Sequence, residues 1–511
     1  MDVTQAGAGR RRGRVAVVAL VVALAALAAG CIPEPPADPP PDPVATLAVT
    51  TSPPAMFPAF SPDVSDYVVR CGGAPFDVNV EAPDAQPIAV GGAAARTGRF
   101  TVSVWRGVGQ AFTIVDQGSA RTYHVRCLPT DFPQFTVSRT GTPQAGHYLI
   151  APIQFSALGF QPTYASVFDA NGVPVWWSKQ SSIFLQQLPN GNLAWTRWNG
   201  TAAEEIALDG SVITTIAAPA PYPGAAFDFH DMVRLDNGNY VIVLNEALPH
   251  QDLSVIDPSL SDVAVFDHRL VEVDPATGDI VWEWRASDHL DVLETDPQWY
   301  PYVASTPDVS LGTPLYDIFH WNSVEATPTG FLLSFRHLDA VYAIDKATGD
   351  VEWKLGGVDI PGESLAISGD SRFPGPGFGG QHDARLVPGG TDTVFDVTLY
   401  DNGSDVSAPP RTPRAVRYTI DTAAGTATLA EEIFDTANAS VSPFAGSARR
   451  LAGGNWMIGF GGTNGFSEVT PTGAVVLHLA IDSGQLVYRA LPAVPGLDPA
   501  ALRAGMDAQY P

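Results

Sequence analysis

Short apolar runs separated by turn residues fill most of the chain, and beyond Phe132 they form two recurring signatures. The first is a turn that leads into an apolar strand, and it occurs at 188–195, 235–243, 327–335, 387–395 and 451–460. The second is a strand, a polar turn with Gly and another strand, and it occurs at 167–177, 205–213, 271–284, 343–355, 418–429 and 467–477. Gly supplies the positive φ of such turns, and Asp or Asn bonds its own backbone there. One pair of signatures therefore predicts about four strands.

Repetition of this four-stranded unit predicts the architecture. About six units are typical of a six-bladed β-propeller, which we place at 131–490, with a C-terminal tail at 491–511. The strands of 167–177 are expected to complete the last blade. The turn acids lack the D-x-D-x-D spacing of calcium loops. Four tryptophans follow the turns at matching places and are interpreted as packing between blades: Trp176, Trp282, Trp284 and Trp353.

Residues 44–130 show a different β pattern. Short strands rich in β-branched and aromatic residues alternate with turns, which is typical of a β-sandwich. The strings Phe60-Ser61-Pro62 and Tyr67-Val68-Val69 resemble those of the cadherin-like β-sandwich modules of bacterial surface proteins. The sequence thus predicts an all-β protein in which a small cadherin-like sandwich precedes the propeller.

The N-terminus has the pattern of an export signal. Arginines at 10, 11, 12 and 14 precede an apolar run over 15–29, which is shorter than the roughly 20 residues of a membrane-spanning helix. Small residues directly before Cys31 resemble the lipobox of bacterial lipoproteins, in which the cysteine is lipidated. We expect a lipoprotein signal at 1–31 with lipidation at Cys31; an ordinary cleaved signal peptide is the alternative. A proline-rich spacer at 32–43 would follow.

The exported protein is expected in the periplasm or on the cell surface, in contact with the membrane through its lipid only. Disulfides persist there, and Cys71 and Cys127 are the two cysteines besides Cys31, which predicts a Cys71–Cys127 bridge. Two buried free thiols are the alternative. The formal charge of −26 argues against nucleic-acid binding, because the phosphates would be repelled.

Three histidines recur just before the first signature of their units. They are His230, His320 and His382, and Arg336 follows in a strand whose neighbours carry apolar or small residues. Because the blades of a propeller converge on one axis, residues at the same blade position should meet at the central channel. Imidazoles beside a guanidinium favour an anion site. Any one of these histidines, taken alone, could instead be a structural histidine with its hydrogen bonds satisfied. The three together could bind zinc, although Arg336 would repel the cation and no carboxylate or thiolate joins the motif.

The motifs around these residues resemble those of the bacterial arylsulfate sulfotransferase (arylsulfotransferase, ASST) family, over roughly 140–490. The strings that carry the resemblance are HDMVRLDNGNYVI, FHWNSVEATPTGFLLSFRHLDAVYAIDKATGDVEWKLGG, and QHDARLVPGG with VTLYDNG. Members of that family are six-bladed propellers in which a histidine attacks the sulfur of an aryl sulfate. The sulfohistidine then passes its sulfuryl group to a phenol. The resemblance implies that His382 is the nucleophile and that His230, His320 and Arg336 line the channel.

Sulfuryl transfer fits these residue types, because charge develops on the nonbridging oxygens and on the departing phenolate. Arg336 would clamp the sulfuryl oxygens, His320 would act as acid and base, and His230 would bind a sulfuryl or phenol oxygen. The expected partners are a small-molecule aryl sulfate and a phenol, with no cofactor and no metal; the oligomeric state is left open. Three aromatic residues are candidate walls for the aryl groups: Phe319, Trp321 and Phe378.

Other functions compete with this one. A non-catalytic, surface-exposed propeller that binds a glycan or another anionic ligand could use the same ring of basic residues. A formylglycine sulfatase needs C-x-P-x-R, and the nearest string, at 127–131, lacks the Arg. A quinone-dependent dehydrogenase would need eight blades and a calcium site. A nucleotide sulfonate donor would need a phosphate-binding Gly-Lys-Ser/Thr loop, which does not occur in the sequence.

Overall fold

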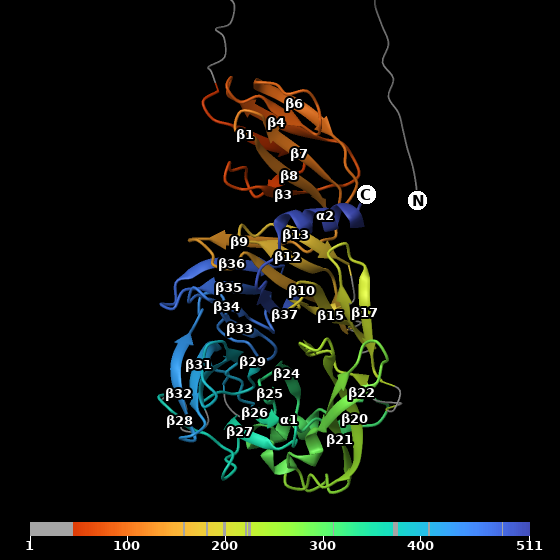
Figure 1. The fold of residues 1–511 in the computed structure, drawn as a ribbon, viewed down its shortest axis with the longest axis vertical. Helices are drawn as coiled ribbons and strands as arrows, with labels where there is room; N and C mark the ends of the chain where they lie inside the picture. The colour runs from red at the N-terminus through yellow and green to blue at the C-terminus, as the bar shows by residue number, and fades with distance from the viewer. Residues whose placement is uncertain are drawn as a thin grey trace, which may run out of the picture. The chain divides into compact units, whose positions relative to one another are not determined.

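The computed structural model describes residues 44–156, 159–179, 182–197, 201–219, 222, 226–309, 311–370, 377–406, 409–482 and 484–511. Regular structure in these residues is mostly β-strand (Figure 1), so the prediction of an all-β protein is confirmed. The predicted signal peptide, Cys31 and the spacer at 32–43 lie outside the described residues. No helix within the described ranges has the length and apolar character needed to cross a bilayer.

The first eight strands form two sheets, and most of their buried hydrophobic side chains belong to one cluster. The three-stranded sheet contains β1 (Ala48–Ser52), β4 (Phe76–Ala82) and β6 (Gly98–Val104). The five-stranded sheet contains β2 (Met56–Phe57), β3 (Asp66–Arg70), β8 (Arg121–Leu128), β7 (Ala111–Asp116) and β5 (Ile88–Val90). Cys71 and Cys127 are bonded to each other within this cluster, which confirms the predicted disulfide.

Six further sheets follow in the described part of the chain, and Figure 1 shows them side by side around one centre. The first contains β10 (His147–Ser156), β11 (Gly159–Pro162), β12 (Ala165–Asp169), β13 (Pro174–Ser178) and β37 (Gln485–Pro492). The second contains β14 (Ser182–Gln187), β15 (Leu193–Arg197), β16 (Ala202–Ile206) and β17 (Val212–Ala217). The third contains β18 (Ala226–Phe227), β19 (Val233–Arg234), β20 (Tyr240–Gln251), β21 (Val263–Val273), β22 (Ile280–Arg285) and β23 (Leu315–Tyr316).

The remaining three sheets complete the ring. The fourth contains β24 (Trp321–Ala326), β25 (Gly330–Phe335), β26 (Ala340–Asp345) and β27 (Val351–Gly356). The fifth contains β29 (His382–Val387), β30 (Val394–Asp401), β31 (Arg414–Asp421), β32 (Thr426–Ile433) and β28 (Ala366–Ser368). The sixth contains β33 (Ser447–Arg450), β34 (Trp456–Gly459), β35 (Gly465–Val469), β36 (Val475–Ile481) and β9 (Phe135–Arg139).

The two sequence signatures correspond to two different turns of a sheet, and only the first sheet of the described ring lacks the first signature, because its innermost strand is β37. The first signature is the turn from the innermost strand to the second, as between β14 and β15 or between β29 and β30. The second is the hairpin between the third and fourth strands, as between β21 and β22. Gly191 and Gly238 of the first signature have φ of +88° and +90°, which a side chain would strain. The repeat therefore encodes the strand order within a sheet.

Asparagines of the first signature also have a structural role. Asn237 and Asn239 donate to Glu272 Oε1 on the third strand of their sheet, at 2.9 and 2.7 Å. In the first signature at 451–460, Asn455 donates likewise to Glu468 Oε1 at 2.7 Å. These carboxylates are buried, and the amides supply the hydrogen bonds that a buried charge requires. The turn residues thus tie the second and third strands together.

The ring is closed by strands from both ends of the described chain. β9 pairs with β36 in the last sheet, and β37 pairs with β10 in the first. Residues 167–177, which are expected to complete the last blade, form β12 and β13 in the sheet that also contains β37, the last strand of the described chain. β9 pairs with the edge of β36 in the neighbouring sheet. Hydrogen bonding at both joins connects the two ends of the ring.

Tryptophans join neighbouring sheets, as the sequence predicted. Trp176 Nε1 donates to Leu208 O at 2.7 Å, and Trp284 Nε1 donates to Gly349 O at 2.9 Å; each acceptor lies in a hairpin turn of the next sheet. Between the third and fourth sheets the chain forms η1 (Ala286–Asp288), η2 (Val292–Glu294), η3 (Pro297–Trp299) and α1 (Tyr300–Ser305). The C-terminal helix α2 (Pro499–Gln509) begins after the Asp498 cap and packs on β13.

Candidate active site

The four predicted basic residues lie at one end of the inner strands. His230 lies between β18 and β19, His320 directly precedes β24, Arg336 directly follows β25, and His382 begins β29. The rings of His230 and His320 are 5.6 Å apart, and the Arg336 N–H donates to His320 O at 2.8 Å. The Tyr488 ring of β37 lies 5.7 Å from that of His230 and 6.5 Å from that of His382. The structure therefore brings the four residues together from three sheets.

His382 is a buried imidazole with a fixed tautomer. Its Nδ1 lies 2.9 Å from Gly380 O and 2.8 Å from Asn402 Oδ1, and a carbonyl oxygen only accepts, so Nδ1 carries the proton. Its Nε2 accepts from the Ala445 N–H at 3.0 Å and therefore carries the lone pair. Burial, and after it the charge of Arg336, holds the pKa of His382 well below its usual 6.5. His382 is thus a neutral imidazole whose lone pair lies on Nε2.

Asn402 can present only its oxygen to His382. Its Nδ2 donates to Ser442 O at 3.0 Å, to Ser442 Oγ at 3.2 Å and to Ala445 O at 2.8 Å. These acceptors fix the orientation of the amide, so Oδ1 faces His382 Nδ1. Asn402 lies in the VTLYDNG string, directly after β30. It is a positioning residue that sequence reasoning did not identify.

Two Asp–His pairs orient the other two histidines. Asp317 Oδ2 lies 2.5 Å from His320 Nδ1, and its Oδ1 accepts from the His320 N–H at 2.9 Å. Asp228 Oδ1 likewise lies 2.7 Å from His230 Nδ1, and its Oδ2 accepts from Asn245 Nδ2 at 2.7 Å. His320 has a φ of +52°, which is rare for a residue with a side chain, and the Asp317 bonds hold it there. Both pairs leave Nε2 of the histidine for a ligand.

The charge balance around His320 suits proton transfer. Burial lowers the pKa of His320, the Asp317 carboxylate opposes that effect, and the charges of Arg336 and His230 add to it. For Asp317, burial raises the pKa, but His320 and the hydrogen bonds it accepts hold its pKa well below 3.8. Asp317 therefore stays ionised, and it would stabilise the imidazolium whenever His320 takes a proton.

Arg336 is a buried cation whose nitrogens face no carboxylate oxygen among the described residues. Its Nη1 donates to His337 Nε2 at 2.8 Å and its Nη2 to Pro443 O at 3.1 Å, while its buried Nε has no hydrogen-bond partner within the described part of the chain. The guanidinium lies 4.2 Å from the centre of the Trp299 ring. Burial lowers the pKa of Arg336. A buried, unneutralised guanidinium is costly, and a bound anion would remove that cost.

His337 supports Arg336. Its Nδ1 donates to Asp317 O at 2.6 Å and its Nε2 accepts from Arg336, so the ring is neutral and burial keeps its pKa well below 6.5. Asp317, His320 and His337 also lie close enough to share a metal ion. The lone pair of His337 is already used by Arg336, however, so the group does not suit a cation. Of the three histidines considered for zinc, this group contains only His320.

The aromatic surroundings differ from the expected walls. Phe319 and Phe378 are buried in two hydrophobic clusters, where Phe378 packs 6.0 Å from Tyr418, so neither is a wall of the histidine site. Both residues lie outside the strands, where nearness to a histidine in the sequence does not fix the direction of a side chain. Trp321 does contact the site, with its ring edge-on to His230 at 6.2 Å.

Other aromatic residues stand around the histidines instead. Phe229 stacks on His230 at 4.5 Å, and Trp299 and Tyr302 lie 4.8 and 5.5 Å from His337. Tyr488 is buried, and its hydroxyl has no hydrogen-bond partner in the structure. Sequence reasoning missed these residues, although the aromatic string at 299–302 is a signal within a long segment between two signatures. The histidines thus have aromatic neighbours beside a buried cation.

Comparison with known proteins identifies a family for most of the chain. The family model described as Arylsulfotransferase (ASST) matches residues 154–490. No curated protein matches the chain.

Solved structures match at low similarity. One is a protein of unknown function from Bacteroides caccae, with 11% identity and a TM-score of 0.39, covering 68% of this chain and 98% of that one. Another is virginiamycin B lyase from Staphylococcus aureus, with 10% identity and a TM-score of 0.30, covering 80% of this chain and 98% of that one. At these TM-scores neither similarity carries a conclusion about this chain.

Proposed function

The chain belongs to the arylsulfotransferase family, and we propose that it moves a sulfuryl group from an aryl sulfate to a phenol through a covalent intermediate on His382. The observation that supports this most is the pairing of a neutral imidazole, His382, with a buried guanidinium, Arg336, that has no carboxylate partner among the described residues. A neutral nucleophile and an unneutralised cation are what an anionic sulfate ester requires. We also propose that the six sheets act as a six-bladed propeller, preceded by a cadherin-like sandwich.

In the first half-reaction, His382 Nε2 attacks the sulfur and the S–O bond to the aryl group breaks, with its electron pair leaving on the phenolate oxygen. His320 donates a proton to that oxygen, and Asp317 stabilises His320 in its protonated form. The new imidazole–sulfur bond makes the His382 ring cationic, and Asn402 Oδ1 and Gly380 O stabilise the Nδ1–H that carries this charge. The Ala445 N–H, released from Nε2, is then available to a sulfuryl oxygen.

The second half-reaction reverses these steps with another phenol. His320, now neutral, removes the phenol proton, the phenolate oxygen attacks the sulfur, and the electron pair of the broken N–S bond returns to His382 Nε2. Arg336 holds the sulfuryl oxygens in both halves, and His230 binds a sulfuryl or phenol oxygen. Because the sulfuryl group waits on the protein, the mechanism is ping-pong and needs no nucleotide donor.

A burst experiment tests the covalent intermediate. Mixing the protein with 4-nitrophenyl sulfate and no acceptor should release about one equivalent of nitrophenol rapidly. The peptide that contains His382 should then carry one sulfuryl group by mass spectrometry. His382→Asn should abolish both signals, whereas His230→Asn should slow the burst without preventing it. His250→Asn is the matched control, because the His250 side chain is 83% exposed and pairs only with Asp262. Sequential kinetics, or a label on His320, would refute the assigned roles.

A non-catalytic binding propeller is the second candidate. The observation in its favour is that His382 Nε2 already accepts a hydrogen bond from Ala445 at 3.0 Å. A protein that only binds would hold the aryl sulfate beside Arg336 and release it unchanged. Saturable binding of 4-nitrophenyl sulfate with no phenol release, even with an added phenol, would support this candidate.

A further inference from the structure

A second cavity lies on the ring axis, away from the histidines. Its volume is about 740 Å³, within the usual range for small-molecule sites. All six ring sheets contribute to it through residues toward the C-terminal ends of their inner strands. These residues are Gln187 of β14, Val233 of β19, Glu325 of β24, Val387 of β29, Arg450 of β33 and Pro492 of β37.

The cavity and the histidine site occupy opposite ends of the same strands. β29 begins with His382 and ends with Val387, which lines the cavity. Five residue steps of an extended strand span about 16 Å. None of the four predicted basic residues is among those that line the cavity. This cavity is therefore separate from the proposed catalytic site.

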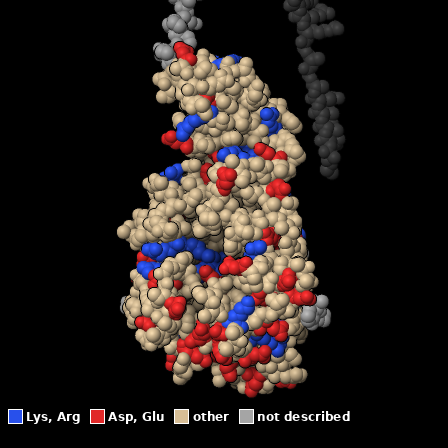
Figure 2. Space-filling view, in the orientation of Figure 1, with Lys and Arg blue, Asp and Glu red and all other residues tan. Residues whose placement is uncertain are grey.

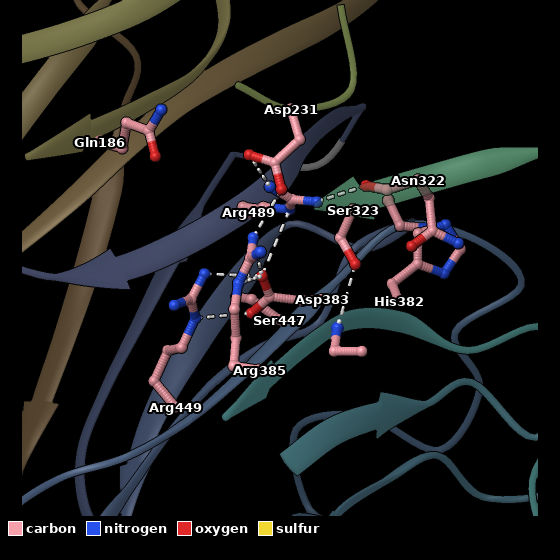
Figure 3. Close-up of polar contacts among 12 residues, drawn as sticks. Gln186, Asp231, Asn322, Ser323, His382, Asp383, Arg385, Ser447, Arg449 and Arg489 are labelled. Atoms are coloured by element: carbon pink, nitrogen blue, oxygen red, sulfur yellow. Dashed lines mark hydrogen bonds and ion pairs between the residues drawn. The ribbon is translucent and has the colours of Figure 1, made fainter. Parts of the chain in front are cut away.

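A layer of buried charges lies between the two sites. Arg385 Nη2 is 2.7 Å from Asp231 Oδ2 and 2.9 Å from Asp383 Oδ1, and Arg489 Nη1 is 3.1 Å from Asp231 Oδ1. Each of these four residues is at most 7% exposed. Figure 3 shows the arginines pointing toward the two aspartates, one of which directly follows His382. The layer neutralises itself, so it leaves no net charge for a ligand.

Two arginines at the edge of this layer face the cavity with spare donors. Arg449 Nε and Nη2 each lie 2.7 Å from the Asp383 carboxylate, and its side chain is 26% exposed. Arg450 contacts Glu431 in the same way, at 2.8 and 3.2 Å. Both line the cavity, and neither Nη1 has a hydrogen-bond partner among the described residues. Figure 2 shows Lys and Arg side chains gathered near β33, whereas acidic side chains crowd the surface near β21 and β26.

Much of the remaining lining is aliphatic. Its apolar members include Met232, Val324, Leu386, Leu451, Leu491 and Val494. No aromatic residue occurs among the described residues that line the cavity. The histidine site, by contrast, is surrounded by aromatic rings. Aliphatic walls around a pair of guanidiniums favour a ligand with a flexible apolar body and an anionic head.

One carboxylate opposes such a head. Glu325 lines the cavity with a side chain 28% exposed, and its Oε2 is 3.8 Å from Arg385 Nε. Asp231, Asp383 and Glu431 are already bonded to arginines, so Glu325 is the carboxylate that an incoming anion would meet. Burial raises the pKa of Glu325, which weakens this repulsion. Removing its charge should therefore favour anion binding.

We propose that this cavity is a second binding site, which takes a small amphipathic anion. The head is a sulfate, sulfonate or carboxylate bound by Arg449 and Arg450, and the body is an aliphatic chain packed against the apolar lining. The site is distinct from the proposed aryl sulfate site in position and in selectivity, because one is lined by aliphatic groups and the other by aromatic rings.

Isothermal titration calorimetry on the full chain tests this, with n-octyl sulfate and n-octanoate as ligands below their micelle concentrations. Both should bind, whereas n-octylamine should not. Arg449→Gln should weaken octyl sulfate binding at least ten-fold, and Glu325→Gln should tighten it. Arg269→Gln is the matched control, because Arg269 also pairs with a carboxylate, Glu246, but does not line the cavity. The Arg269→Gln variant should bind octyl sulfate with the same affinity as the unaltered protein.

Two further variants keep the test decisive if Arg449→Gln unfolds the protein. Arg450→Gln removes the neighbouring cation without touching the buried layer, and Val387→Trp fills the cavity from the end of β29. Both should weaken octyl sulfate binding while the nitrophenol burst stays unchanged. If the ligand bound elsewhere, such as on the apolar N-terminal segment, its affinity would be the same in all of these variants. Equal affinities in the unaltered, Arg450→Gln and Val387→Trp proteins, or equally tight binding of octylamine, would overturn the proposal.

Discussion

At the scale of single residues, the histidine site combines two features that do not stabilise the fold. Arg336 is buried with one nitrogen unpartnered, and His382, His320 and His337 are held with lowered pKa values. Uncompensated buried charge costs free energy of folding. A bound sulfuryl group would compensate Arg336, so the arrangement is better explained by ligand binding than by stability.

Arg336→Lys should reduce turnover of 4-nitrophenyl sulfate by about 100-fold or more, because one ammonium cannot reproduce the planar set of donors around a sulfuryl group. Steady-state kinetics measure the loss, and thermal unfolding checks that the fold is kept. Arg269→Lys is the control. Arg269 lies on β21 and pairs with Glu246 of β20, so this variant should keep full turnover. Near-normal activity of Arg336→Lys would remove Arg336 from the site.

Asp317→Asn should slow the first half-reaction because the neutral amide no longer stabilises protonated His320 or selects its tautomer. The loss should be greater for phenyl sulfate than for 4-nitrophenyl sulfate, since the poorer leaving group depends more on the proton. The carboxylate raises the pKa of His320, so its removal lowers that pKa. The acid form then disappears at lower pH, and the basic limb of kcat/KM should move to lower pH.

The matched control is Asp228→Asn, which breaks the equivalent pair at His230. It should slow the reaction without changing the dependence on the leaving group. If both variants gave the same leaving-group dependence as the unaltered protein, His320 would not be the acid.

At the scale of elements, β24 and β29 each border two sites. The histidine site lies at the start of strands such as β24 and β29, and the second cavity lies at their ends. The strands must therefore stay fixed relative to one another, and that depends on closure of the ring. β9 on β36 and β37 on β10 provide it.

Ser138→Pro should destabilise this closure. Gln134 O accepts from the Asp482 N–H, and the Thr140 N–H donates to Val476 O, so the antiparallel alternation directs the Ser138 N–H at β36. Proline removes that hydrogen bond and should lower the free energy of unfolding by about 1–3 kcal/mol. Arg139→Pro is the control, because its N–H points away from β36. Urea unfolding that gave the same loss for both variants would contradict the assigned pairing.

At the scale of the whole molecule, the net charge of −26 contrasts with the two proposed sites, which both bind anions. The proposed ligands of both sites are anions, so each site must offset a general repulsion by its own arginines. Salt screens exposed charges strongly and buried charges much less. Raising the salt concentration should therefore weaken the repulsion from the acidic surface more than the attraction of the arginines, and so favour entry of the anion.

Attachment to the membrane is also a property of the whole molecule. We propose that Cys31, which lies outside the described residues, carries the lipid anchor. Cys31→Ser should then release the protein from membranes into the soluble fraction while turnover per molecule stays the same. Cell fractionation followed by activity measurement checks this. Retention of the variant in membranes would indicate a different anchor.

The sequence by itself determined the strand order within each sheet, because the turn chemistry of Gly, Asn and Asp acts over a few residues. It also predicted that His230, His320 and His382 would meet, since equal places in a repeat converge on one axis. The Asp317–His320 and Asp228–His230 pairs were within reach of the same reasoning, because each aspartate stands two or three residues before its histidine.

Only the tertiary structure decided how the ring closes, where β9 pairs with β36 and β37 pairs with β10. It also decided that Phe319 and Phe378 belong to the core while Tyr488 faces the histidines. The fixed tautomer of His382 depends on Asn402 and Ala445, and the second cavity depends on strand ends from six sheets. These contacts join residues far apart in the chain, and no local pattern encodes which of many apolar or polar side chains meet after the ring has closed.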